Sequence, residues 1–203
     1  MLELICIIGL ILLNIPSATI LILLVCIIKI GIRKLSWKDI GFETPKNILR
    51  TMMLGLMIAI LYQLLSIMVF VPIISSFTAT RIDLSKIIAL KDSWNNMLFA
   101  IIMSWTFAAF GEEIVYRGYM NDLIHRVFAR PKAGMILGLM ISTILFALGH
   151  GYQGISGIVE NIIFGLTMGI VYSLSRKNLW LPILIHGFVD TIGLGLIFAG
   201  WYS

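Results

Sequence analysis

Long apolar stretches separated by short polar segments follow one another along the chain and predict helices that span a membrane. Crossing a hydrocarbon core of about 30 Å takes roughly 20 apolar residues in an α-helix. Six stretches approach or exceed this length, and Asn14 and Pro16 interrupt the first. They cover residues 2–30 and 51–75, a stretch that starts near Asn96 and carries Glu112, and residues 133–148, 155–174 and 179–199. The pattern predicts an all-α fold, a polytopic transmembrane helical bundle of about six spans.

The composition indicates an integral membrane protein and argues against a soluble one. Of the 203 residues, 60% are hydrophobic and 12% are charged, and the mean hydropathy is +1.02. This length suits one compact helical unit, so we expect residues 1–203 to form a single integral membrane domain in contact with the lipid bilayer. The net charge of +5 is modest and reads as charge in the loops, so it does not indicate a nucleic-acid partner.

The distribution of lysine and arginine predicts the orientation of the spans, because cytoplasmic loops carry an excess of these residues. The odd-numbered loops hold eleven of them and the even-numbered loops hold three. Those in the odd loops are Lys29, Arg33, Lys34, Lys38, Lys46, Arg50, Arg126, Arg130, Lys132, Arg176 and Lys177, and those in the second loop are Arg81, Lys86 and Lys91. We predict a multi-pass protein of the cell membrane with both termini outside and the odd-numbered loops in the cytoplasm.

The first loop contains a segment that could lie on the membrane surface. Residues 35–42, Leu-Ser-Trp-Lys-Asp-Ile-Gly-Phe, predict a short interfacial helix with Trp37 as its anchor. An ordinary polar loop explains the same residues nearly as well.

A charged motif ends the third apolar stretch: Phe110-Gly-Glu-Glu-Ile-Val-Tyr-Arg-Gly-Tyr119. A charge at mid-membrane disfavours insertion by roughly 2.5–3.5 kcal/mol, so such groups are usually paired or face a wet cavity. Glu113 and Arg117 are four residues apart and can form an ion pair on one helix face. Glu112 points about 100° away and lacks that partner. We interpret Arg117 as fixing Glu113 and leaving Glu112 available as a base; an ion pair that only orients helices is an equal alternative.

Two further motifs place histidines in apolar surroundings. Phe146 and His150 are four residues apart, and so are His186 and Asp190, so each pair shares a helix face. Taken singly, each has a plain alternative: a packing histidine in the first case and a closed internal pair in the second. Together with Glu112, they supply the groups needed to activate water and stabilise an oxyanion. Small residues between Phe164 and Gly169 predict close helix packing, and Glu160 receives no role.

Chain geometry allows these groups to meet. Glu112 lies 18 residues before Arg130, and His150 lies 19 residues after Pro131. Two antiparallel helices joined at that turn would hold Glu112 and His150 at nearly equal height. His186 would lie roughly 12 Å into the membrane from the preceding turn, at about 1.5 Å per residue. We expect a cavity on the cytoplasmic half of the bundle.

The motifs Glu112-Glu113-x-x-x-Arg117, Phe146-x-x-x-His150 and His186-x-x-x-Asp190, in this order on separate helices, resemble the CAAX prenyl protease and bacteriocin-processing family. This family comprises the type II CAAX endopeptidases and their bacterial Abi relatives. The resemblance covers residues 95–195 as a catalytic core, and residues 37–41 are similar to a segment that precedes the core in bacterial members. Three motifs in order at plausible spacing are specific, although each alone is weak.

The resemblance implies an intramembrane glutamate endopeptidase that forms no covalent intermediate and needs no cofactor. By this similarity Glu112 and His150 activate water, His186 and Asp190 stabilise the oxyanion, and Arg117 supports Glu112 and Glu113. Phe146 is the candidate substrate-binding residue. The substrate would be a membrane-associated protein or peptide, either prenylated or a bacteriocin precursor.

One position departs from the family pattern. Residue 190 is often asparagine in the prenyl-protein branch, and it is aspartate here. An ionised aspartate would repel an oxyanion, so Asp190 must be protonated or must act by orienting His186.

Three other readings compete with the protease. A non-catalytic family member could bind a partner or confer bacteriocin immunity. A transporter or proton relay could use the same carboxylates, although we find neither a repeat nor a continuous polar path. A zinc protease could use Glu112, His150 and His186, but these ligands lie on different spans and no His-Glu-x-x-His helix is present. We therefore expect no metal.

Overall fold

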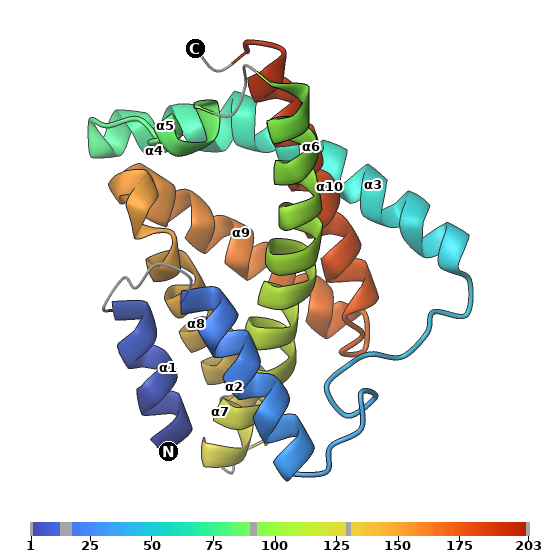
Figure 1. The fold of residues 1–203 in the computed structure, drawn as a ribbon. Coiled ribbons are helices and arrows are strands. Elements are labelled where there is room, and N and C mark those ends of the chain that lie inside the picture. Colours follow the sequence, from blue (N-terminus) through green and yellow to red (C-terminus); the bar gives the residue numbers. More distant parts are fainter. Residues whose placement is uncertain (1, 13–17, 90–92, 129–130, 202–203) are drawn as a thin grey trace.

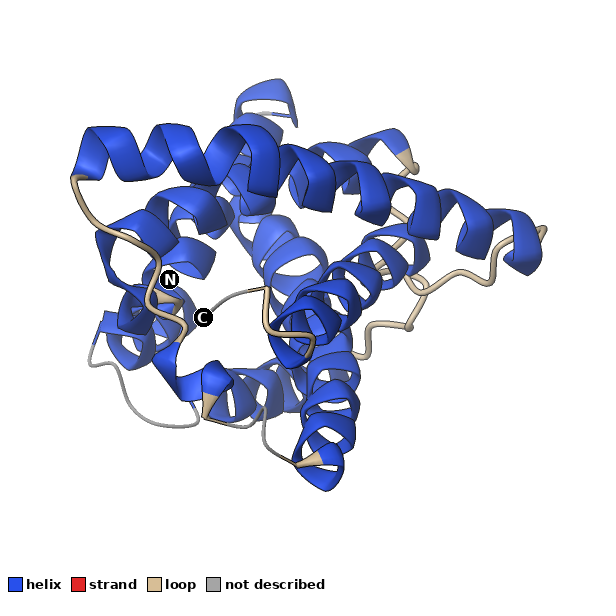
Figure 2. Cartoon of the chain, turned by 90° about the horizontal axis from the view of Figure 1, so that it is seen from above, coloured by secondary structure: helices blue, strands red, loops and turns tan. Residues whose placement is uncertain are grey.

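The computed structural model describes residues 2–12, 18–89, 93–128 and 131–201, and every regular element in this part of the chain is a helix (Figure 2). The all-α fold is confirmed. In chain order the elements are α1 (Leu2–Leu12), α2 (Ala18–Ile32), α3 (Ile48–Leu65), η1 (Ser66–Phe70), α4 (Val71–Thr78), α5 (Ser85–Ile88), α6 (Trp94–Met103), η2 (Ser104–Met120), α7 (Asn121–Phe128), α8 (Pro131–Gly149), η3 (Gly151–Gln153), α9 (Gly154–Leu174) and α10 (Trp180–Phe198).

Four continuous helical segments within the described residues are long and apolar enough to cross a membrane. They are Ile48–Thr78, Trp94–Ile124, Gly151–Leu174 and Trp180–Phe198, which correspond to the second, third, fifth and sixth predicted spans. The fourth predicted span falls in α8, whose apolar part, Gly134–Gly149, is shorter. The total of six spans, the orientation of the termini and the single domain with a core at residues 95–195 stay predictions.

The first predicted span is wrong as a single helix. The apolar stretch forms two helices, α1 and α2, which lie beside each other and run in opposite directions (Figure 1). Asn14 and Pro16 lie outside the described residues. Proline inside a helix removes a backbone hydrogen bond and clashes with the preceding turn, which favours two helices over one.

The predicted interfacial helix at residues 35–42 is also not present. These residues form a turn in which the Asp39 carboxylate accepts hydrogen bonds from the backbone and hydroxyl of Ser36. Gly41 has a φ of +98°, and a Cβ at this position would lie 2.4 Å from the carbonyl oxygen of Lys177. The Gly41 carbonyl accepts from the Leu179 amide at 2.8 Å. The segment is therefore docked on the turn between α9 and α10, whereas an interfacial helix would lie on the membrane surface.

The charged motif lies on a long rod formed by α6, η2 and α7, which runs the length of the molecule (Figure 1). Its central part, η2, is a π-helix of 17 residues. Such helices have i→i+5 hydrogen bonds and occur mostly as short bulges at functional sites. This rod contacts α2, α8 and α10, so the motif is enclosed by helices from both ends of the chain.

Close approach between helices depends on small residues, as the sequence predicted for the fifth span. A Cβ on Gly169 of α9 would lie 2.0 Å from Leu139 of α8, and one on Gly165 would lie 3.1 Å from Thr143. A Cβ on Gly187 of α10 would lie 2.6 Å from the ring of Trp105. The helices that carry the polar motifs are thus brought together at positions where a larger side chain would clash.

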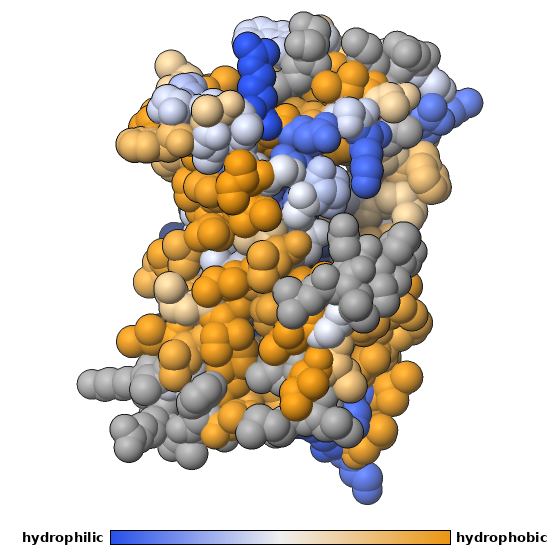
Figure 3. All heavy atoms as spheres, turned by 90° about the vertical axis from the view of Figure 1, so that its left-hand side faces the viewer, coloured by the Kyte–Doolittle hydropathy of each residue, from blue (hydrophilic) through white to orange (hydrophobic). Residues whose placement is uncertain are grey.

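The surface suits a lipid environment. Hydrophobic side chains cover most of the middle and lower part of the face in Figure 3, and hydrophilic side chains gather toward its upper end and at its lower right edge. On α3 the side chains of Met53, Met57 and Leu61 are more than half exposed. A continuous apolar surface of this kind marks a membrane or partner contact, and the long apolar helices make this a membrane protein.

Cysteine labelling tests the predicted orientation. We expect a cysteine at position 38 to be shielded from a membrane-impermeant thiol reagent added to intact cells, and one at position 88 to react. The reason is the excess of lysine and arginine in the first loop. The background variant has alanine in place of both native cysteines, exposed Cys6 and buried Cys26. Reaction at position 38 and protection at position 88 would reverse the assignment.

Candidate active site

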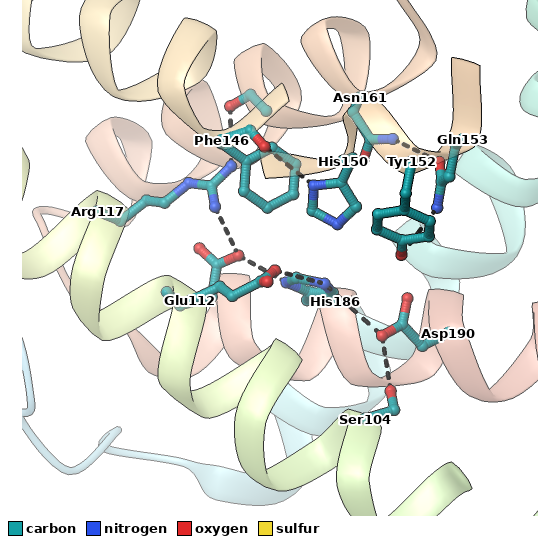
Figure 4. A network of polar contacts seen from close by, with 12 residues as sticks. Ser104, Glu112, Arg117, Phe146, His150, Tyr152, Gln153, Asn161, His186 and Asp190 are labelled. Carbon is teal, nitrogen blue, oxygen red and sulfur yellow. Dashed lines mark hydrogen bonds and ion pairs between the residues drawn. The ribbon is translucent and has the colours of Figure 1, made fainter. Parts of the chain in front are cut away.

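A cavity of about 790 Å³ lies among α3, α6, η2, the junction of α8 and α9, and α10. Of the seven residues singled out in the sequence motifs, five line it: Glu112, Phe146, His150, His186 and Asp190. Glu113 and Arg117 are buried behind them. Residues from η2, α10 and the end of α8, which are far apart in the chain, therefore meet in one place (Figure 4).

Glu113 is the centre of a buried charged cluster. Its Oε1 accepts a hydrogen bond from Arg117 Nη1 at 3.0 Å and lies 2.8 Å from His186 Nδ1. The predicted ion pair between Glu113 and Arg117 is present, and the short contact with His186 is an addition that helical spacing does not predict. Because an ionised carboxylate only accepts, Nδ1 of His186 carries a hydrogen in this contact. Glu113 thereby fixes the plane of the His186 ring.

Arg117 also joins α9 to this cluster. Its Nη2 donates to the carbonyl oxygen of Gly165 at 3.2 Å, and its guanidinium carbon lies 4.7 Å from the centre of the Phe146 ring. Because Gly165 has no side chain, the α9 backbone lies close to Thr143 and Phe146 of α8 at this point. Arg117 is 3% exposed and Glu113 is 0% exposed, so the pair is withdrawn from solvent.

Glu112 is placed differently from its neighbour. Its Oε2 lies 3.9 Å from His186 Nε2, too long for a hydrogen bond, and this buried atom has no hydrogen-bond partner among the described residues. A buried acceptor without a partner is unfavourable and calls for an explanation, such as a catalytic role. Oε2 of Glu113 also has none, but Glu113 does not line the cavity. Glu112 is thus a carboxylate facing the cavity with at least one oxygen uncommitted.

His150 follows the end of α8 and its ring is oriented by the backbone. Its Nδ1 lies 2.9 Å from the carbonyl oxygen of Phe146, and since a carbonyl only accepts, Nδ1 carries the hydrogen. The other nitrogen, Nε2, is then free to accept a hydrogen bond in the neutral ring. In Figure 4 the His150 ring extends toward the side where Glu112 and His186 lie.

Phe146, the predicted substrate-binding residue, is 1% exposed although it borders the cavity. Its ring packs edge-on against Tyr116 at 5.4 Å and lies 4.7 Å from the His150 ring. These contacts make it a wall of the site, and a direct contact with substrate stays a prediction.

Asp190 forms its short hydrogen bond with a partner that the sequence did not suggest. Its Oδ2 accepts from the Ser104 hydroxyl at 2.6 Å, whereas His186 Nε2 lies 3.7 Å away. The predicted pairing of Asp190 with His186 is therefore a loose contact. Ser104 lies on η2, 86 residues from Asp190, and no spacing rule connects residues at that separation.

Other cavity residues were also missed from sequence. Glu160 Oε1 accepts from the hydroxyls of Tyr62 at 2.9 Å and Ser66 at 3.2 Å, which ties α9 to the second candidate span. The only sequence feature that could have indicated a role for Glu160 is its position as a single acidic residue within an apolar stretch.

Among the described residues no group of three or more histidine, cysteine, aspartate and glutamate side chains has a geometry that could hold a metal ion. The absence of a metal from the reaction stays a prediction.

Comparison with known proteins gives one match. A family model described as type II CAAX prenyl endopeptidase Rce1-like matches residues 94–192. No curated protein and no solved structure matches the chain. The matched segment begins with α6 and contains all seven residues of the three sequence motifs. Residues 94–192 are thus an Rce1-like domain, similar to the type II CAAX prenyl endopeptidases, and at the level of that family the match indicates a membrane-embedded peptidase.

Proposed function

We propose that the protein is an intramembrane endopeptidase in which Glu112 and His150 activate a water molecule for attack on a peptide bond. One observation carries this assignment: Glu112 presents an unpaired buried oxygen to the same cavity into which His150 presents its uncommitted nitrogen. A carboxylate base and a hydrogen-bond acceptor on one water molecule are what general-base hydrolysis requires.

The chemical steps need no covalent link to the protein. Glu112 takes a proton from the water, whose oxygen forms a bond to the carbonyl carbon, and the carbonyl oxygen becomes an oxyanion. Glu112 then returns the proton to the amide nitrogen as the carbon–nitrogen bond breaks. His150 orients the water through Nε2, because its Nδ1 is held by the Phe146 carbonyl.

His186 is the proposed oxyanion donor. Its Nδ1 is bound to Glu113, which Arg117 holds in turn, so Nε2 is directed toward the cavity side where Glu112 and Asp190 lie. A protonated Nε2 would donate to the developing oxyanion, an interaction that strengthens as negative charge forms. Asp190 accepts from Ser104 and acts in this scheme by orienting His186.

The substrate is proposed to be a membrane-associated protein or peptide. Most of the surface that lines the cavity is apolar and includes Phe99, Met103, Phe164 and Ile197. Sites of this volume take a few residues of a peptide or one lipid-like group. A prenylated protein and a bacteriocin precursor are both compatible with such a lining.

Comparison of membrane proteomes tests the function directly. Cells that produce the wild-type chain and cells that produce Glu112→Ala are compared by sequencing of protein N-termini or C-termini in the membrane fraction. We expect at least one terminus that depends on Glu112. If both strains show identical termini at equal amounts of protein, the chain is a non-catalytic member that binds a partner.

We further expect cleavage to survive exhaustive chelation, with far less than one zinc ion per active chain. The physical reason is that Glu113 is held by Arg117 and by His186 Nδ1, and that no group of three or more histidine, cysteine, aspartate and glutamate side chains among the described residues is placed to hold a metal ion, whereas zinc enzymes commonly present three protein ligands. Elemental analysis of active purified protein and cleavage before and after chelation provide the measurement. One zinc per chain, with activity lost on removal and regained on return, would identify a metalloprotease.

A further inference from the structure

Tyr152 lies two residues after His150, in the single turn η3 that joins α8 to α9. It lines the cavity and is 38% exposed. No sequence motif included it. Its backbone surroundings are fixed: the next amide, that of Gln153, donates to the His150 carbonyl at 2.9 Å, and the Gln153 carbonyl accepts from the Asp83 amide at 3.0 Å. The aromatic ring has the Lys86 ammonium 5.0 Å from its centre.

A chain of hydrogen bonds sets the direction in which the Tyr152 hydroxyl can donate. Asn161 Nδ2 donates to the carbonyl oxygen of Gly157 at 2.8 Å, which identifies that atom as the nitrogen of the amide. The same Nδ2 donates to Gln153 Oε1 at 2.9 Å, so Nε2 of Gln153 faces Tyr152. Nε2 then donates to Tyr152 Oη at 3.3 Å. Because the phenol oxygen is the acceptor in this bond, its own hydrogen remains available to another acceptor.

That hydrogen is available on the cavity side of the ring. In Figure 4 the Tyr152 hydroxyl points toward the Asp190 carboxylate, on the side of the site where His150 and His186 also lie. No hydrogen bond donated by Tyr152 is present among the described residues. Asp190 itself is a poor candidate for an oxyanion donor, since it accepts from Ser104 and an ionised carboxylate has no hydrogen to give.

We propose that Tyr152 is a second donor to the oxyanion, acting beside His186, and that the Asn161–Gln153 amide chain keeps its hydroxyl in the donating orientation. This inference rests on the proposed endopeptidase function. A neutral hydroxyl supplies what Asp190 lacks, and it does so without adding a further charge to a site that already contains three carboxylates. A donor fixed in advance also avoids reorganisation when the negative charge forms.

The test uses the full chain in detergent with the peptide that the proteome comparison identifies, and with a peptide aldehyde that ends at its cleavage site. An aldehyde hydrate resembles the tetrahedral intermediate and so reports on oxyanion contacts.

Tyr152→Phe is expected to lower kcat by about 10²–10³-fold, the usual loss for one oxyanion donor. Its affinity for the aldehyde should fall by a similar factor. Binding of the uncleaved peptide, measured with Glu112→Gln present in both proteins, should change less than threefold.

Gln153→Glu provides a second variant that retains the tyrosine. A carboxylate at position 153 would accept the Tyr152 hydrogen and withdraw it from the cavity, so the same losses are expected with the ring and hydroxyl in place. Tyr62→Phe is the matched control, because the Tyr62 hydroxyl also borders the cavity but donates to Glu160; its kcat should stay within about threefold of wild type.

The outcomes separate this inference from the function on which it rests. Wild-type kcat and aldehyde affinity in both Tyr152→Phe and Gln153→Glu would overturn the donor role while leaving the endopeptidase intact. Parallel loss of aldehyde and peptide binding would show that Tyr152 only supports the shape of the cavity. A wild-type protein that neither cleaves the peptide nor prefers the aldehyde would overturn the proposed function itself.

Discussion

Glu112→Gln is expected to lower the rate of cleavage by at least about 10²–10⁴-fold, the usual contribution of a general base. Glutamine has nearly the shape of glutamate but cannot take a proton from water. Its introduction breaks no hydrogen bond of Glu112 Oε2, which has none among the described residues. Yield, helical content and the unfolding temperature in detergent should therefore remain close to those of the wild type. Single-turnover cleavage of the identified peptide is the appropriate measurement.

His150→Ala should produce a loss of similar size with the protein still folded, because His150 is partly exposed to the cavity. Glu160→Gln is the control for Glu112→Gln. Glu160 is another carboxyl group that lines the same cavity, and its glutamine variant retains an oxygen that can accept from Tyr62 and Ser66. We expect cleavage by this control within a few-fold of wild type. Near-normal turnover by Glu112→Gln or His150→Ala would exclude the proposed mechanism.

Arg117→Ala is expected to lower the free energy of unfolding by about 3–5 kcal/mol, as well as to abolish activity. The substitution leaves the fully buried Glu113 carboxylate without its guanidinium partner and removes the donor to Gly165. It also removes the contact with the Phe146 ring. Thermal unfolding in detergent and the yield of membrane-inserted protein measure the effect. Arg117→Lys keeps the charge but lacks the planar guanidinium that donates to both Glu113 and Gly165. Its loss of unfolding free energy should therefore lie between that of the wild type and that of Arg117→Ala.

A double variant separates the cost of the buried charge from the loss of packing. Combining Glu113→Gln with Arg117→Ala removes both charges, so part of the lost stability should return, whereas activity should not, because His186 loses its ionised partner. If Arg117→Ala alone unfolds at the wild-type temperature, the cluster does not contribute to folding in the way described.

Local spacing was sufficient to predict part of the site. The pairing of Glu113 with Arg117 follows from their separation of four residues, and the meeting of Glu112 with His150 follows from their similar distance to the turn at Pro131. The contact between Glu113 and His186 could not be predicted, because it joins residues 73 positions apart. It depends on how α10 packs against η2, where Gly187 meets Trp105.

Hydropathy predicted the helices better than their connections. The second, third, fifth and sixth apolar stretches correspond to long helices, because roughly 20 apolar residues have few alternatives to a helix in a bilayer. Hydropathy did not show that residues 2–32 divide into two helices, since both halves are equally apolar. Nor did it show that residues 35–42 form a docked turn, which depends on a glycine conformation and on contacts with the distant residues 177 and 179.

The π-helical form of η2 makes the number of residues in this segment as important as their identity. Each turn of η2 holds more residues than a turn of the α-helices on either side. If the winding of η2 is kept, deletion of a single residue between Ser104 and Gly111 would shift every later residue of the rod by one position. Everything after the deletion would then rotate by up to about 100° relative to the helices that surround it. Glu112 would leave the cavity although no residue of the site had been altered. During divergence this stretch should therefore reject insertions and deletions, which a surface loop usually tolerates.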